Sequence, residues 1–230
     1  MTPVLLAVAL MFAPMGPPPT PPVISDAGRA VIGEWQAALD AVRVRQAQAG
    51  PPKTAGEAVS RMAELDREGE AATTAFADAG LDAADLAGVN LIAGFTLRRL
   101  AHDNIEALQA RLPPGGWFRI SRDGAVATHD AWWIVWRSED KAFTATALKR
   151  MAPLARKGEV AGEDYARLYD RAAVEAGRPQ VYGSYWMCRE GQLILPDLAE
   201  PETVDSRRAK VRWRETLAAT KARLKIGEPC

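Results

Sequence analysis

The chain has 230 residues, of which 48% are hydrophobic and 25% charged, and its 29 basic residues equal its 29 acidic residues. This composition is typical of a globular protein and excludes a chain that is disordered throughout. A net charge of zero argues against nucleic acid as a partner, because proteins that bind polyanions usually carry a basic surplus. No apolar run reaches the ~20 residues of a membrane-spanning helix, so we expect no membrane span in the mature chain.

The first sixteen residues predict a secretory signal peptide. Residues 4–13 form an unbroken apolar run, and the core of a signal peptide usually has ~7–15 such residues. No Lys or Arg precedes the run, and Pro14 and Pro17 crowd the cleavage region, so an uncleaved N-terminal anchor and an apolar helix packed on the domain stay open as alternatives. We predict a signal peptide over 1–16, a stiff proline-rich linker over 17–24 and one periplasmic or secreted helical domain over 25–230.

Apolar residues recur at helical spacing through the first half of the predicted domain. With Ser25 as N-cap, the first predicted helix runs until the Gly-Pro-Pro sequence at 50–52. A second helix is expected over 55–79, and a third carries a long apolar stripe over 86–112 before the Pro-Pro-Gly-Gly breaker. Asn104 interrupts that stripe. An unpaired buried amide would cost roughly 1–3 kcal/mol, so we expect a hydrogen-bond partner, and favour a structural one over a ligand.

The second half predicts further helices and then one hairpin. The apolar run over 131–136 fits a buried strand or a buried helix, because periodicity does not separate the two. Helices are expected over 141–156 and from residue 162 to Gly177. Strand-forming residues over 181–188 and 192–195, with a turn between them, predict a β-hairpin. A charged helix is expected over 201–225, and its basic residues are interpreted as a solvated face.

Two cysteines, Cys188 and Cys230, are present. In an oxidising compartment they are expected to form a disulfide across 42 positions, whereas two free thiols are the alternative. Nucleotide-binding glycine loops, zinc-binding HExxH and CxxC pairs and the GxSxG nucleophile motif are absent from the sequence, so we expect no cofactor and no metal. His102 and His129 are expected to be solvated rather than to act as general bases. A carboxylate site drawn from Asp66, Glu139, Asp140 and Asp170 is left open.

Several short motifs lie in a fixed order between residues 61 and 208. They are RMAELD (61–66), Asn104 with Leu108, GWFRIS (116–121), AWWIV (131–135), KGEV (157–160), LYDR (168–171), GRPQVYG (177–183) and VDSRR (204–208). In this order and spacing they resemble a bacterial family of unknown function, domain-of-unknown-function family 6624. The resemblance implies a largely helical domain and no established activity. It is the reason why we predict a helix rather than a strand over 124–138.

The chain departs from the pattern of this family at polar positions. The family pattern has Gln-His-Ala where this chain has Trp136, Arg137 and Ser138, and it has DQxxR where residues 66–70 read DREGE. Arginine cannot replace a histidine base, because its pKa lies above ~12 and it stays protonated. We predict that Arg137 and the retained polar residues converge on one pocket. The retained residues are Asp66, Asn104, Asp170, Arg171, Gln180 and Tyr182.

The sequence therefore predicts a mainly α fold: a helical domain with a small C-terminal β-hairpin and a charged C-terminal helix. The favoured function is that of an exported, divergent, non-catalytic family member that binds a small molecule or a protein. One alternative is a hydrolase-like enzyme in which Asp66 or Asp170 is the acid–base group and Arg137 or Arg171 holds an anionic substrate. A structural cell-envelope protein is the third. Whether the chain is an enzyme is left open at this point.

Overall fold

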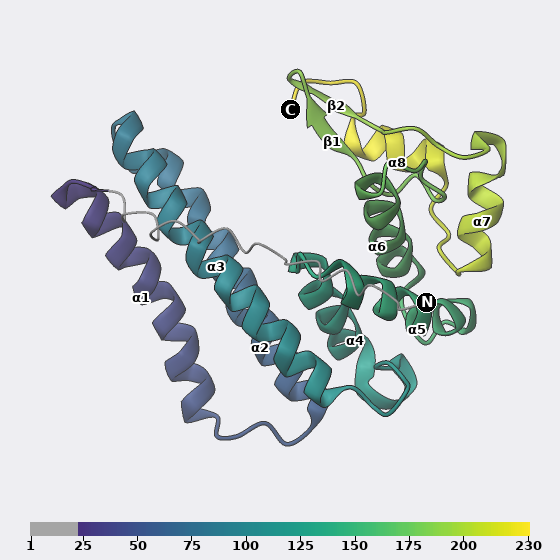
Figure 1. The fold of residues 1–230 in the computed structure, drawn as a ribbon, viewed down its shortest axis with the longest axis horizontal. Coiled ribbons are helices and arrows are strands. Elements are labelled where there is room, and N and C mark those ends of the chain that lie inside the picture. Colours follow the sequence, from purple (N-terminus) through teal and green to yellow (C-terminus); the bar gives the residue numbers. More distant parts are fainter. Residues whose placement is uncertain (1–22) are drawn as a thin grey trace, which may run out of the picture.

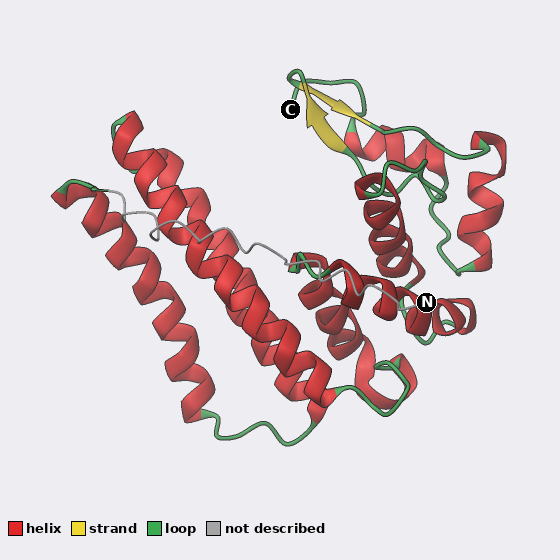
Figure 2. Ribbon diagram, viewed as in Figure 1, coloured by secondary structure: helices red, strands yellow, loops and turns green. Residues whose placement is uncertain are grey.

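The computed structural model describes residues 23–230, which contain eight α-helices and one two-stranded hairpin (Figures 1 and 2). The predicted signal peptide and the predicted linker up to residue 22 lie outside the described residues. Among the helices of the described part, none combines the length and the apolarity that crossing a membrane requires. The mainly α fold with a small hairpin near the C-terminus, followed by a helix, is confirmed.

Three long helices lie side by side in the N-terminal part (Figure 1). They are α1 (Asp26–Gln48), α2 (Ala55–Ala72) and α3 (Ala83–Arg111), and a short 3-10 helix (Thr73–Asp78) follows α2. Ser25 caps α1 as predicted, since its hydroxyl accepts a hydrogen bond from the N–H of Gly28 at 3.3 Å. The apolar stripes of the helices bury a core between them.

Three further helices complete the larger core. They are α4 (Ile120–Arg137), α5 (Lys141–Lys157) and α6 (Gly162–Glu175). The run over 131–136 lies in α4, so the prediction of a helix there is confirmed. Because α4 packs against α2 on one side and against α5 and α6 on the other, it connects the N-terminal helices with the rest of the molecule.

The hairpin is shorter than predicted. Its strands are β1 (Met187–Arg189) and β2 (Gln192–Ile194), joined by Glu190 and Gly191. Both turn residues have positive φ, as a two-residue type I′ turn requires. The prediction of a strand over 181–186 is wrong. The backbone groups of that segment bind buried side chains of α6 and α7 instead of a neighbouring strand.

The predicted continuous helix over 201–225 is also wrong. A 3-10 turn (Pro201–Thr203) leads into α7 (Val204–Lys210), the chain then turns, and α8 (Leu217–Leu224) follows. Arg212 has a φ of 62°, which is incompatible with a right-handed helix. Just before this turn, the guanidinium of Arg208 stacks on the ring of Trp213, 3.8 Å from its centre, and it also donates to the carbonyls of Tyr182 and Gly183.

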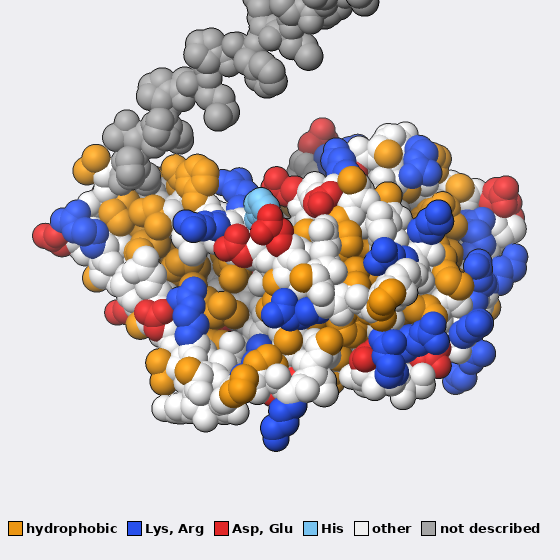
Figure 3. Space-filling model, turned by 60° about the horizontal axis from the view of Figure 1, so that its bottom comes forward, with side chains coloured by type: hydrophobic (Ala, Val, Ile, Leu, Met, Phe, Trp, Pro, Cys, Tyr) orange, Lys and Arg blue, Asp and Glu red, His pale blue; other side chains and the backbone are white. Residues whose placement is uncertain are grey.

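On the face shown in Figure 3, apolar side chains are interspersed with charged side chains of both signs. Basic side chains gather on the right-hand side of this view, where α5, α7 and α8 lie in Figure 1. On this face the basic side chains are therefore denser over the C-terminal half than over the three N-terminal helices.

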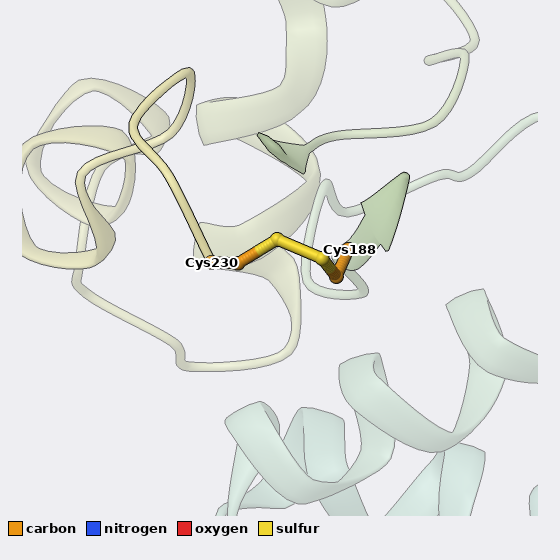
Figure 4. Close-up of a disulfide and its surroundings, with 2 residues drawn as sticks. All are labelled: Cys188 and Cys230. Carbon is orange, nitrogen blue, oxygen red and sulfur yellow. A yellow bond between two sulfur atoms is a disulfide. The ribbon is translucent and has the colours of Figure 1, made fainter. Parts of the chain in front are cut away.

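The Cys188–Cys230 disulfide is confirmed (Figure 4), with 5.9 Å between the two Cα atoms. It joins β1 to the C-terminal residue. The tail also pairs with β2, because the N–H of Leu193 donates to the carbonyl of Glu228 at 2.9 Å and the N–H of Gly227 donates to the carbonyl of Leu193 at 2.7 Å. The end of the chain is therefore held to the hairpin by covalent and hydrogen bonds together.

Candidate functional site

A groove, which we call the α3 groove, runs along α3 beside the end of α4. It consists of two adjoining hollows of about 420 and 380 Å³ that share Arg98, Ala101, Arg137 and Glu139. Its lining combines small and apolar side chains of α3 with charged side chains of both signs. The residues not shared by the two hollows are Glu70, Thr73, Asn90, Ala93, Gly94, Leu97, His102, Ile105, Glu106, Gln109, Ser138 and Asp140.

Arg137 connects this groove to a buried carboxylate. It lies at the end of α4, where Nη2 is 2.5 Å from a carboxylate oxygen of Glu70 and Nε is 3.4 Å from Oδ2 of Asp66. Asp66 is only 1% exposed, and the indole N–H of Trp133 donates to it at 2.7 Å. Burial raises the pKa of Asp66, while Arg137 and Trp133 act in the opposite direction. Arg137 and Trp133 thus enclose Asp66, which does not line the groove.

A second pair joins the same two helices. Arg67 of α2 contacts the buried carboxylate of Asp130 of α4 at 2.5 Å. The α2–α4 contact therefore contains two ion pairs, each with a buried carboxylate: α2 supplies the carboxylate of one pair and the arginine of the other. Breaking a buried pair leaves an uncompensated charge, so both pairs favour this one register of α2 on α4.

Two positions at which the chain departs from the family pattern face each other in the structure. The pattern's arginine position holds Glu70 and its histidine position holds Arg137, and these two side chains form the 2.5 Å ion pair.

Asn104, a retained residue, is 6% exposed on α3. The hydrogen-bond partner expected for its amide is not found among residues 23–230.

Asp170 lies in α6, outside the α3 groove, and is completely buried. Its carboxylate accepts hydrogen bonds from the N–H groups of Val181, Tyr182 and Ser184 and from the Ser184 hydroxyl, at 2.7 to 3.1 Å. Burial raises the pKa of Asp170 and these donors lower it. Every neighbour is a donor, so the carboxylate holds the segment over 181–184 in place and has no free face for a substrate.

Arg208 binds the other side of the same segment. It is completely buried, and its guanidinium donates to the carbonyls of Tyr182, Gly183 and Glu215 at 2.8 to 3.0 Å. Arg208 is not among the predicted pocket residues, although it ends the VDSRR motif. A buried carboxylate and a buried guanidinium therefore hold one loop between them, through its N–H groups and its carbonyl groups respectively.

The other retained residues also make structural contacts. Arg171 donates to the carbonyl of Trp136 and so satisfies the end of α4, and its guanidinium lies 4.8 Å from the centre of the Trp136 ring. The side chain of Gln180 donates to the carbonyl of Pro196 at 3.1 Å and accepts from the N–H of Tyr185 at 2.8 Å.

Tyr182 packs in a cluster of aromatic rings. Its ring centre lies 6.0 Å from that of Tyr165 and 5.7 Å from that of Tyr169, in edge-to-face arrangements. Burial raises the pKa of Tyr182.

Of the seven residues predicted to share one pocket, Arg137 alone lines the α3 groove, and Asp66 lies next to it. The four residues from Asp170 to Tyr182 belong to the framework around residues 180–186.

The two histidines differ in environment. His102 lines the α3 groove, with Nδ1 3.9 Å from a carboxylate oxygen of Glu106. His129 of α4 is half-exposed, bonds to Asp164 at 2.9 Å and stacks on Trp132, with 5.0 Å between ring centres. Within the described residues, no three His, Cys, Asp or Glu side chains are grouped so that they could hold a metal ion.

Replacing His129 with glutamine is expected to destabilise the protein more at pH about 5.5 than at pH about 8.5. The hydrogen bond with Asp164 raises the pKa of His129 above 6.5. The stabilisation is therefore full below the unfolded-state pKa and is lost as the pH rises through the folded-state pKa. The effect should be about 1 kcal/mol or less, because the imidazole of His129 is half-exposed. Denaturant unfolding at both pH values measures it, and an equal loss at both would contradict it.

Comparison with known proteins gives one match. The model of a family described as a family of unknown function, DUF6624, matches residues 60–218. No curated protein and no solved structure matches the chain. The matched range begins in α2 and ends in α8, so it contains the α3 groove, Asp170 and Arg208, while α1 and Cys230 lie outside it.

Proposed function

We infer that this chain, which belongs to DUF6624, a family of unknown function, is an exported helical protein. We propose that it binds a ligand in the α3 groove and does not catalyse a reaction. The ligand class is a small molecule or a segment of another protein. A hydrolase-like reaction at Asp66 or Asp170 is the alternative that this proposal rejects.

The burial of Asp66 and Asp170, the two carboxylates of the hydrolase alternative, is the observation that carries the proposal. Asp66 is 1% exposed beneath Arg137 and Trp133, and Asp170 is 0% exposed with hydrogen-bond donors around it. An acid–base group must lie within hydrogen-bond distance of the substrate proton, directly or through one water. Neither carboxylate lines the groove, and the guanidinium of Arg137 that does so cannot act as a base.

The lining of the groove favours a long ligand that carries both charges. Along α3 the lining extends from Asn90 to Gln109, which corresponds to ~28 Å at ~1.5 Å per residue. The charge of Arg137 is already matched by Glu70 and Asp66, whereas Arg98 has no carboxylate within 4 Å among the described residues. Glu106 and Glu139 supply negative charge nearby. A short peptide, with one amino and one carboxylate end, has the size and charges that this lining suits.

Export is supported by the disulfide and by the apolar N-terminal run. Disulfides persist in oxidising compartments and are rare in the bacterial cytosol. Cys188 and Cys230 are bonded in this structure, and the described residues contain no free cysteine. A periplasmic or secreted location agrees with both features.

Filling the groove at Gly94 is expected to abolish ligand binding without unfolding the protein. Gly94 lies in α3, and a Cβ atom there would meet no other atom within 4 Å. Gly94→Trp places a large ring in the groove, whereas the matched control Gly94→Ala adds one methyl group and should stabilise α3 by about 0.5–1 kcal/mol. Thermal-shift measurements of the exported protein with a panel of di-, tri- and tetrapeptides should show stabilisation for the native chain and the alanine variant and none for the tryptophan variant.

Three results would contradict the proposal. Equal stabilisation of all three proteins by a peptide would place its site elsewhere. Hydrolysis of nitrophenyl esters or phosphates that disappears in Asp66→Asn, with folding intact, would show that the chain is an enzyme. Recovery of the chain only from the cytosol, with two alkylatable thiols, would contradict export.

A further inference from the structure

Another hollow, which we call the α5 pocket, lies beside α5 and shares no lining residue with the α3 groove. Its volume is about 530 Å³, and it is formed by the turn and extended segment before α4 and by one face of α5. Thr146, Lys149, Arg150 and Pro153 contribute from α5, at the spacing that places residues on one face of a helix. The size falls within the ~300–1,000 Å³ typical of small-molecule sites.

The charge of this pocket is of one sign. Arg119, Lys149 and Arg150 line it, and no Asp or Glu is among its lining residues. None of the three cations has a carboxylate partner within 4 Å in the described part of the chain. Three positive groups around one hollow repel each other unless an anion lies between them, and such clusters raise the local concentration of anions.

The nearest acidic residues are engaged elsewhere. Asp123 accepts hydrogen bonds from Arg122 at 2.7 Å and from the N–H of Arg119 at 2.8 Å. Glu159 accepts from the N–H and the hydroxyl of Ser121 at 3.0 and 2.7 Å. Neither carboxylate lines the pocket, and neither forms an ion pair with Arg119, Lys149 or Arg150 within 4 Å in the described part of the chain.

The uncharged part of the pocket wall includes apolar side chains. Trp117 and Leu154 contribute apolar surface to the pocket, and both are buried. The indole N–H of Trp117 is buried and has no hydrogen-bond acceptor among the described residues. Arg150 donates to the carbonyl of Gly116 at 3.4 Å, which fixes the loop against α5. The wall therefore suits an anion that carries an organic group.

We propose that the α5 pocket binds the phosphate group of an organic phosphate ester. A phosphate monoester carries about −1.5 to −2 charges near pH 7 and three acceptor oxygens, which three cationic donors can match, whereas one carboxylate supplies a single charge. This site is separate from the α3 groove and does not depend on the function proposed for that groove. The phosphate can belong to a soluble metabolite or to a lipid headgroup.

Reversing one charge in the pocket tests this proposal. Titration calorimetry of the full chain with glycerol 3-phosphate should show binding that Lys149→Glu weakens by about tenfold or more. Lys149 is exposed, so the variant should fold, and Arg119→Glu at a second exposed position should behave alike. Lys53→Glu, at an exposed lysine that does not line the pocket, is the matched control and should bind as the native chain does.

Sedimentation with vesicles separates the two sources of phosphate. Binding to glycerol 3-phosphate that depends on Lys149, without binding to vesicles, would support the proposal with a soluble ester as ligand. Binding to phosphatidylglycerol vesicles but not to phosphatidylcholine vesicles, lost in Lys149→Glu and kept in Lys53→Glu, would support it with a lipid headgroup as ligand. No binding in either experiment, or equal binding by the native chain and Lys149→Glu, would overturn it.

Discussion

Replacing Asp170 with asparagine is expected to lower the free energy of unfolding by about 3 kcal/mol. The carboxylate is fully buried and accepts hydrogen bonds from the N–H groups of Val181, Tyr182 and Ser184. An asparagine of almost the same size turns one acceptor oxygen into an NH₂ group that faces these donors. At least one buried N–H then loses its partner, and the charge that strengthened the other bonds is gone.

Asp197→Asn is the matched control, because Asp197 is exposed and should tolerate the same change within about 0.5 kcal/mol. Denaturant unfolding of the native chain and both variants measures the difference. If Asp170→Asn were as stable as the native chain but lost an activity, Asp170 would be a catalytic acid or base and the structural role assigned to it would be wrong. A large loss of stability agrees with the structural role.

Replacing Gly162 with alanine should destabilise the protein by about 3 kcal/mol or more. Gly162 is the first residue of α6, and the Cβ atom of an alanine would lie 1.9 Å from the carbonyl oxygen of Val211 and 3.0 Å from the backbone N of Trp213. These are backbone atoms of the turn between α7 and α8. They cannot rotate away as a side chain does, so α6 or the turn has to move.

Gly33→Ala provides the comparison for this change. Gly33 lies inside α1, and a Cβ atom there would meet nothing within 4 Å. Alanine is the better helix former, so this variant should gain about 0.5–1 kcal/mol. Thermal unfolding of the two variants should therefore shift in opposite directions. A Gly162→Ala variant as stable as the native chain would show that α6 does not approach the α7–α8 turn as closely as described.

These two sites show which structural contacts most of the retained polar residues make. Asp170 and Arg208 bind the two sides of residues 181–184, and Gly162 lets the turn after α7 approach the start of α6. Arg171 satisfies the end of α4 in the same region. The positions that resemble the family pattern between 168 and 208 thus hold α4, α6, the loop and α7 together. Of the predicted pocket residues, Arg137 lines the α3 groove.

Local signals in the sequence indicated the three N-terminal helices and where they begin or end. Ser25 at an N-cap, the Gly-Pro-Pro and Pro-Pro-Gly-Gly breakers and the apolar stripes act within a few residues, so they are visible without a structure. The disulfide was equally accessible, because two cysteines allow one pairing. The helix over 131–136 was not determined by periodicity, since an all-apolar run suits either structure, and only the resemblance to the family indicated it.

The tertiary structure alone decided the roles of the charged residues and the ends of the C-terminal elements. Asp66 accepts a hydrogen bond from a donor 67 positions away, and Asp170 accepts from donors 11 to 14 positions away. No local sequence pattern shows whether such a carboxylate is a free acid or a structural acceptor. The residues at 181–186 have strand-forming side chains, yet buried Asp170 and Arg208 bind their backbone groups first. The tail turns after α7, where buried Arg208 binds the carbonyls of the distant residues Tyr182 and Gly183. In each case a contact between distant segments outweighs a local preference, because it satisfies a buried charge that local structure leaves unpaired.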